Sequence, residues 1–190
     1  MTITGDQSVA SYLEAIGARS STPGGGAVAA IVAAEACALI EMVLNFTKSE
    51  DARLDGMLNR LVASREQLLE LADADMHAFK RVMKAYKGEG DLQQALTSAA
   101  EVPASVIRIC LTHIADAELI AELGNKNLMT DTAIAASLLQ SSLDASELNV
   151  LINVKSMTGH TDDLIALLAN LPAQRRKLDG ISDQIKSALL

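Results

Sequence analysis

Apolar residues recur at helical spacing along almost the whole 190-residue chain, and short polar stretches separate the segments that show this spacing. We predict six helices, over residues 6–17, 24–48, 52–86, 91–122, 130–157 and 161–188. The clearest breaks between them are KGEGD, GNKN and MTGHTDD. Because these connections are short, consecutive helices should run antiparallel. The pattern therefore predicts a single all-α domain over residues 1–190, an antiparallel multi-helix bundle with long helices.

Composition supports this fold class and narrows the function. Hydrophobic residues make up 49% of the chain and aromatic residues only 2%, so Ala, Leu, Ile, Val and Met must build the core. The net charge of −8 argues against a nucleic-acid partner, because no basic stripe could neutralise phosphates. We interpret the one basic cluster, Arg175, Arg176 and Lys177, as a solvated helix face.

Cysteine usage and the N-terminal residues suggest an intracellular protein. Cys37 and Cys110 each lie in an apolar helical stretch, and we predict that both are buried free thiols. The first residues show no basic segment followed by an apolar core, which a secretory leader requires. Cytoplasm is the predicted location.

Pro23 and the three glycines Gly24, Gly25 and Gly26 precede a run of small apolar residues, 27–44. A phosphate loop is excluded, because no lysine follows the glycines at the required spacing. The run is nearly long enough for a membrane span, but it carries Glu35 and Glu41, so we predict no membrane partner.

The remaining interpretation of this segment is the start of a helix. Thr22 can cap it, Pro23 suits its first turn, and the glycines leave the first N–H groups uncovered. Such a start can bind an anionic or polar ligand, or it can allow a tight helix crossing. The residues alone leave both alternatives open.

A polar stripe lies on the predicted helix 130–157, whose other residues are mostly apolar. Its members recur every three or four residues and so share one face: Ser142, Ser146, Asn149, Asn153 and Ser156. A helix of this kind is buried on most sides, and buried polar groups need partners. The stripe either forms hydrogen bonds with a neighbouring helix, across a subunit interface included, or it lines a ligand site.

Two further groups are candidates for chemistry. Asp75 shares a helix face with Phe79 and Val82, which would carry its carboxylate toward the core. Burial raises the pKa of a carboxyl group, which could then act as a general base or acid. The second group, Asn125, Asn127 and Asp131, gathers around one helix start, where loop and cap interactions are the alternative role.

The histidines do not indicate a metal site. His77, His113 and His160 have no metal-ligand spacing, and no Cys/His cluster accompanies them, so we predict no metal. We interpret His113 and Asp116 as a local surface pair.

Six segments resemble the cyclodeaminase/cyclohydrolase family in their order and spacing. They are STPGGGAVAA, ALIEMVLNFT, DADMHAFKRVMKAY, AAEVPASVIRIC, ELGNKNLMTDTAIAASLL and LNVLINVKSM. This family contains the cyclodeaminase half of formiminotransferase-cyclodeaminase and the standalone methenyltetrahydrofolate cyclohydrolases. The resemblance covers nearly the whole chain.

The resemblance implies an all-helical homodimer that binds folate in a cleft near the dimer interface, without a metal or an organic cofactor. One reaction in the family hydrolyses 5,10-methenyltetrahydrofolate to 10-formyltetrahydrofolate. The other closes 5-formiminotetrahydrofolate to the methenyl form and releases ammonia. Both pass through a tetrahedral carbon between N5 and N10 and need proton transfer at nitrogen.

The resemblance also suggests roles for the candidate residues. Asp131 or Asp75 could transfer the proton. The expected substrate-binding residues are Asn125, Asn127, Asn149 and Asn153, which could contact the pterin or orient water, and Pro23, Gly24, Gly25 and Gly26, which would form a wall or anion contact of the cleft. Convergence of Asp131, Asn125 and Asp75 on one open pocket would support an enzyme.

The chain departs from the family pattern at two places. Relatives carry a lysine-rich stretch where this chain reads KSEDARL, and a longer basic segment where it reads AYKGEGDLQQAL. Such basic residues would hold the carboxylates of folate. The absence of a formiminotransferase half and the LNVLINVKSM segment favour the cyclohydrolase. The alternatives are the cyclodeaminase and a non-catalytic folate-binding or interaction protein.

Overall fold

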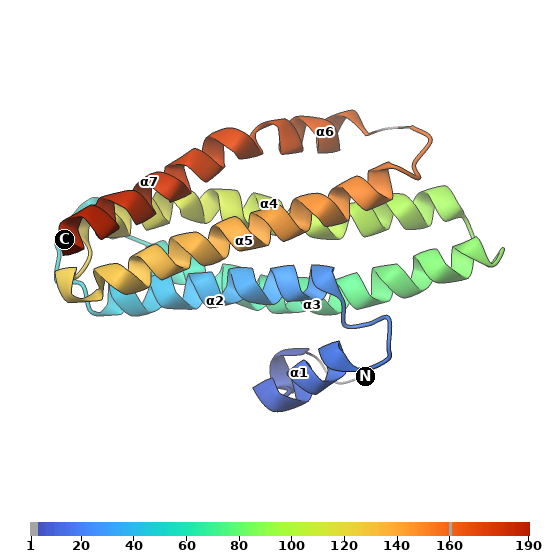
Figure 1. Ribbon diagram of the computed structural model, residues 1–190, viewed down its shortest axis with the longest axis horizontal. Coiled ribbons are helices and arrows are strands. Elements are labelled where there is room, and N and C mark those ends of the chain that lie inside the picture. The colour runs from blue at the N-terminus through green and yellow to red at the C-terminus, as the bar shows by residue number, and fades with distance from the viewer. Residues whose placement is uncertain (1–3, 160) are drawn as a thin grey trace.

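A computed structural model describes residues 4–159 and 161–190, and every regular element in these ranges is a helix. Four long helices form the bundle: α2 (Gly25–Asn45), α3 (Met57–Tyr86), α4 (Leu92–Leu123) and α5 (Met129–Val154). α2 and α4 each pack against both α3 and α5. The chain reverses at each connection, so neighbouring helices are antiparallel (Figure 1). The predicted all-α bundle is confirmed.

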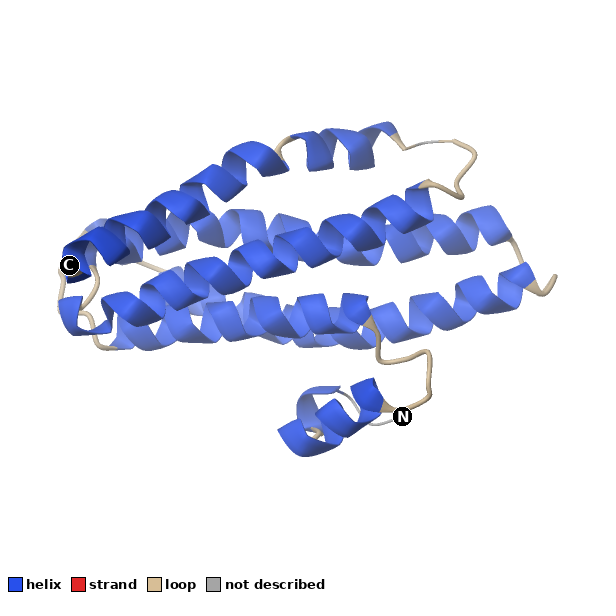
Figure 2. Ribbon diagram, in the orientation of Figure 1, coloured by secondary structure: helices blue, strands red, loops and turns tan. Residues whose placement is uncertain are grey.

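Shorter helices flank this bundle (Figure 2). They are η1 (Thr4–Asp6), α1 (Val9–Gly17), η2 (Ala52–Leu54), η3 (Lys126–Leu128), α6 (Asp162–Ala169) and α7 (Leu171–Leu189). The predicted last helix is thus two helices that meet at Asn170, and Pro172 lies in the first turn of α7, where its missing N–H is tolerated. Arg175 does not simply face solvent, because it forms ion pairs with Asp144 and Glu147 of α5.

α2 is a central helix of the core. Its completely buried residues are mainly alanines, including Ala27, Ala30 and Ala33, whose small side chains let neighbouring helices approach closely. α2 is long and apolar enough to cross a membrane, but half of its apolar window is buried inside the bundle, which supports a core helix. Cys37 and Cys110 are buried free thiols, as predicted.

His113 and Asp116 form a buried pair on α4, and the prediction of a surface pair was wrong. His113 Nδ1 lies 2.8 Å from Asp116 Oδ2, and Arg60 of α3 donates to Asp116 Oδ1 at 2.9 Å. Spacing along α4 shows that His113 and Asp116 are neighbours, but the packing of other helices around α4 decides that they are buried.

We expect Asp116→Asn to lower the free energy of unfolding by about 2–4 kcal/mol at neutral pH, because it leaves Arg60 and His113 without their anionic partner. Burial acts to raise the pKa of Asp116, but hydrogen bonds from His113 and Arg60 lower it below its usual value. A lowered folded-state pKa stabilises the protein above the unfolded-state pKa, and this contribution is lost as pH falls through the folded-state value. Urea unfolding from about pH 7 to about pH 3 should show the difference between wild type and variant shrinking. A difference independent of pH would contradict this role.

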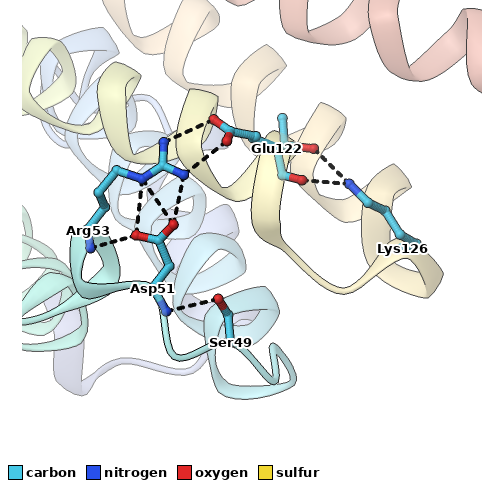
Figure 3. A network of polar contacts seen from close by, with 6 residues as sticks. Ser49, Asp51, Arg53, Glu122 and Lys126 are labelled. Atoms are coloured by element: carbon cyan, nitrogen blue, oxygen red, sulfur yellow. Dashed lines mark hydrogen bonds and ion pairs between the residues drawn. The ribbon is translucent and has the colours of Figure 1, made fainter.

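Exposed ion pairs join the α2–α3 connection to α4 at the end of the bundle where α2 and α4 finish. Arg53 lies between Asp51 and Glu122, with contacts of 2.8 and 3.0 Å, and Lys126 Nζ donates to the Glu122 carbonyl at 2.8 Å (Figure 3). Hydrogen bonds from Arg53 hold the pKa of Asp51 below its usual value. The KSEDARL segment therefore supplies a structural contact between the α2–α3 connection and α4.

Candidate functional site

A cavity of about 400 Å³ opens at the N-terminal end of α2. α2 begins well inside the bundle, whereas α3 and α4 continue past this point to their connection (Figure 1). The cavity lies in the space beyond the first turn of α2, between α3, α4 and α5. Its lining residues are Ser21, Thr22, Gly24, Gly25, Gly26, Asp75, Ala78, Phe79, Val82, Met83, Tyr86, Leu96, Ala99, Asn149, Ile152, Asn153 and Ser156. Mostly apolar walls with a few polar groups are typical of small-molecule sites.

Asp75 lies directly against the first turn of α2. Its Oδ2 accepts a hydrogen bond from the Ala27 N–H at 3.1 Å. A Cβ atom on Gly26 would lie 2.1 Å from Asp75 Oδ1, so only glycine permits this approach. The structure therefore shows the tight-crossing alternative for the glycine segment, and this crossing of α2 and α3 places the carboxylate at a cavity. Ligand binding at the helix start stays a prediction.

The start of α2 differs from the prediction in two details. The N-cap residue is Gly24, which has no capping side chain, and Thr22 does not cap the helix. A carboxylate from α3 takes over this role because it accepts from Ala27. Pro23 precedes the N-cap and is not among the cavity-lining residues, so of the predicted glycine-segment contacts only Gly24, Gly25 and Gly26 reach the cavity.

The environment of Asp75 suits proton transfer. Burial raises its pKa, and the hydrogen bond from the Ala27 N–H opposes this rise. A carboxyl group with a raised pKa exchanges its proton closer to neutral pH than an exposed aspartate does, which is what a general acid or base requires.

The polar stripe of α5 divides between two roles. Ser142 Oγ donates to an α2 carbonyl at 2.8 Å, and buried Ser146 has no hydrogen-bond partner for its Oγ among the described residues. Asn149, Asn153 and Ser156 line the cavity. The Nδ2 groups of Asn149 and Asn153 donate to carbonyls of α5 at 2.7 and 2.8 Å, which holds both amides in place.

Asp131, Asn125 and Asn127 do not meet Asp75 within one chain. Asp131 is in the first turn of α5 and Asn149 near its end, about 27 Å apart along the helix axis. Asn125 joins helix ends instead, because its Nδ2 donates to the Phe46 carbonyl at 3.1 Å and its Oδ1 accepts from the Asn127 N–H at 3.0 Å. The expected convergence on one pocket is absent from the single chain.

Sequence reasoning missed several residues around the site, and Met83, Tyr86 and Tyr12 are three of them. Met83 and Tyr86 continue the face of Asp75, Phe79 and Val82 along α3, and the helical period could have identified them. Tyr12 of α1 gives no such signal. Its Oη is enclosed and has no hydrogen-bond partner among the described residues, and burial together with the charges of Glu35 and Asp75 raises its pKa to about 12.

No group of three or more potential metal ligands occurs within residues 4–159 and 161–190. His160, one of the three histidines considered above, lies outside these described residues.

The cavity of this all-helical bundle combines a partly buried carboxylate with a helix start, an arrangement that can hold a small molecule and exchange protons with it. The family model described as formiminotransferase-cyclodeaminase matches residues 8–165. The chain belongs to this family, which confirms the resemblance inferred from its motifs.

Relatives from both branches of the family match this chain. It is 31% identical over 172 residues to methenyltetrahydrofolate cyclohydrolase of Methylorubrum extorquens, covering 82% of this chain and 83% of that protein. It is 34% identical over 170 residues to formimidoyltransferase-cyclodeaminase of Rattus norvegicus, covering 80% of this chain and 31% of that protein. The chain thus spans about a third of the length of the rat relative.

A solved structure shares the fold. The crystal structure of formiminotetrahydrofolate cyclodeaminase from Thermotoga maritima is similar with a TM-score of 0.81 and 39% sequence identity, and the match covers 96% of each chain. The named relatives are enzymes.

Proposed function

We propose that this protein is a methenyltetrahydrofolate cyclohydrolase, which hydrolyses 5,10-methenyltetrahydrofolate to 10-formyltetrahydrofolate. The observation that carries this proposal is the position of Asp75, held against the start of α2 at the edge of a cavity of about 400 Å³ with a raised pKa. The cyclohydrolase of Methylorubrum extorquens, matched over most of both chains, supports the choice of reaction.

The proposed reaction begins with water adding to the methenyl carbon, which carries positive charge shared with N5 and N10. The Asp75 carboxylate stabilises this charge and accepts a proton from the water as the new C–O bond forms. The resulting carboxylic acid then protonates N5 while the bond between carbon and N5 breaks. The hydroxyl proton leaves to solvent as the carbonyl forms, so the formyl group stays on N10 and one proton is released overall.

Formiminotetrahydrofolate cyclodeaminase activity is the second candidate, favoured by the 39% identity to the Thermotoga maritima enzyme over nearly the whole chain. In that reaction N10 attacks the formimino carbon and ammonia leaves. The tetrahedral carbon lies at the same place between N5 and N10, and Asp75 would transfer protons there as well. A non-catalytic folate-binding or interaction role is the remaining alternative.

We propose that the protein is a homodimer with the site near the interface. Exposed apolar side chains lie on α1 and α5, among them Val9, Leu13, Leu148 and Ile152, and such surfaces mark interfaces. A two-fold pairing with antiparallel α5 helices would bring the Asp131 end of one subunit toward the cavity of the other. The predicted roles of Asp131, Asn125 and Asn127 depend on this arrangement.

Sedimentation at micromolar concentration should report twice the 20.0 kDa mass of the chain. A protein that remains monomeric would contradict both the dimer and a role for Asp131 in the Asp75 site. Folate as the small-molecule partner is part of the proposal. A cytoplasmic location and the absence of a cofactor, a nucleic-acid partner and a membrane partner stay predictions.

The function is tested by following the absorbance of methenyltetrahydrofolate with wild type and Asp131→Asn. Decay faster than in buffer supports the cyclohydrolase, and loss of this decay in Asp131→Asn supports completion of the site by a second subunit. If decay is not accelerated, ammonia release from formiminotetrahydrofolate decides for the cyclodeaminase. The absence of both activities would contradict an enzymatic role.

A further inference from the structure

Aromatic side chains are rare in this chain, and half of them line the cavity. The sequence contains two Phe, two Tyr and no Trp, and Phe79 and Tyr86 are both lining residues. Met83 lies between them on the same face of α3. The exposed fraction is 37% for Phe79, 42% for Met83 and 55% for Tyr86. Neighbouring exposed apolar side chains on a cavity wall indicate a surface that a ligand covers.

The rise of α3 places this surface relative to Asp75. At 1.5 Å per residue, Phe79 lies about 6 Å, Met83 about 12 Å and Tyr86 about 16 Å beyond Asp75 along the helix axis. The apolar surface therefore begins one turn from the carboxylate and continues toward the α3–α4 connection. We call Phe79, Met83 and Tyr86 the α3 wall.

The Asp75 end of the cavity has a different character. The first turn of α2, with Gly25 and Gly26, lies beside the carboxylate, and the Cβ position of Gly25 is 3.9 Å from Asn149 Nδ2. Backbone N–H groups at a helix start and the Asn149 amide offer hydrogen bonds there. The α3 side of the cavity thus changes from polar at Asp75 to apolar along the α3 wall, while Asn153 and Ser156 of α5 supply further polar lining.

This inference rests on the proposed function. We propose that the aminobenzoyl ring of the folate packs on the α3 wall, while the pterin lies at the polar end with Asp75 and Asn149. The aminobenzoyl ring is attached to N10 and therefore lies next to the reacting carbon, and its flat apolar face matches aromatic and thioether side chains. The pterin carries amide-like groups along its edge, which need hydrogen-bond partners when they are buried.

The proposal is tested with two fragments used as inhibitors, p-aminobenzoylglutamate and a soluble pterin, on wild type, Phe79→Leu and Tyr86→Leu. Leucine keeps an apolar side chain but lacks the ring. We expect each variant to weaken inhibition by p-aminobenzoylglutamate about tenfold and to raise KM by a similar factor, whereas kcat and inhibition by the pterin change little. Tyr86→Phe, which retains the ring, should recover most of the loss.

Ile165→Ala on α6 is the matched control, because Ile165 is an exposed apolar residue that does not line this cavity. It should keep the wild-type values of all four quantities. Circular dichroism and thermal unfolding will show that the α3 wall variants fold, as expected for side chains that are already partly exposed.

If the variants weaken inhibition by the pterin and leave inhibition by p-aminobenzoylglutamate unchanged, the proposed orientation of the folate is overturned. Wild-type values for both fragments in both variants would overturn the α3 wall itself. If turnover is absent, calorimetric binding of 5-formyltetrahydrofolate provides the same comparison. A wild type that neither turns over nor binds any folate contradicts the proposed function, whereas an active wild type with unaffected variants contradicts only this inference.

Discussion

Asp75→Asn is expected to lower kcat/KM for methenyltetrahydrofolate by about 100-fold to 10,000-fold, the usual contribution of a general acid or base. Asparagine has the same shape, and its amide oxygen can still accept the hydrogen bond that Ala27 N–H donates at 3.1 Å. The variant should therefore fold like the wild type. It cannot take up or release the proton, so the loss should appear in kcat rather than in substrate binding alone.

The pH dependence of the wild type gives a second measurement of the same role. Because burial raises the pKa of Asp75 in the free protein, the acid limb of the kcat/KM profile, which reports the free enzyme, should lie above the usual pKa of an aspartate. The rate should rise with pH as the carboxylate forms and then level off. The residual activity of Asp75→Asn should lack this limb.

Asp73→Asn is the matched control for Asp75→Asn. Asp73 lies on the same helix but accepts hydrogen bonds from the backbone N–H and the hydroxyl of Thr4, at 2.9 and 2.5 Å, and it does not line the cavity. Its replacement should loosen η1 and leave turnover in place. An active Asp75→Asn together with an inactive Asp131→Asn would move the chemistry to the other end of α5.

Gly26→Ala is expected to abolish most of the activity, with a loss comparable to that of Asp75→Asn. The new Cβ would lie 2.1 Å from Asp75 Oδ1 and 2.5 Å from its Cγ, far inside normal contact distances. Either the carboxylate leaves its position or α2 moves. We expect the free energy of unfolding to fall by about 1–3 kcal/mol, as for other overpacked sites.

Gly180→Ala controls for the effect of adding a methyl group to a helix. Apart from the chain neighbours and backbone of α7 itself, no atom of the described residues lies within 4 Å of the Cβ position of Gly180. This change should therefore stabilise the protein by about 0.5–1 kcal/mol through helix propensity. The double variant Gly26→Ala with Asp75→Asn provides the sharper test. If Gly26 acts by positioning Asp75, the double variant should be no less active than Asp75→Asn alone. Fully additive losses, or wild-type activity in Gly26→Ala, would contradict this positioning role.

The hydrophobic pattern by itself determined the helices of the bundle and one face of the site. Helical periodicity is set by residues three and four positions apart, so it is readable without the fold. The same local rule placed Asp75, Phe79 and Val82 on one face of α3, and all three line the cavity. It also placed Asn149, Asn153 and Ser156 on one face of α5.

Helix length could have corrected one prediction before the structure was known. A helix over residues 130–157 already separates Asp131 from Asn149 by about 27 Å, so both could contact one substrate only if a second subunit contributed one of them. The residue pattern identified candidate groups, but it did not state at which end of the bundle each group lies.

Only the tertiary structure decided how the site is assembled. Asp75 meets the start of α2 across 48 positions of the chain, and Gly26 owes its identity to that contact rather than to its own backbone conformation. The burial of His113 and Asp116 and the contact of Asp116 with Arg60 of α3 likewise depend on how the helices pack. Local sequence specifies which face of a helix is apolar, whereas the packing of whole helices specifies which faces and which ends meet. The proposed proton-transfer site depends on this packing.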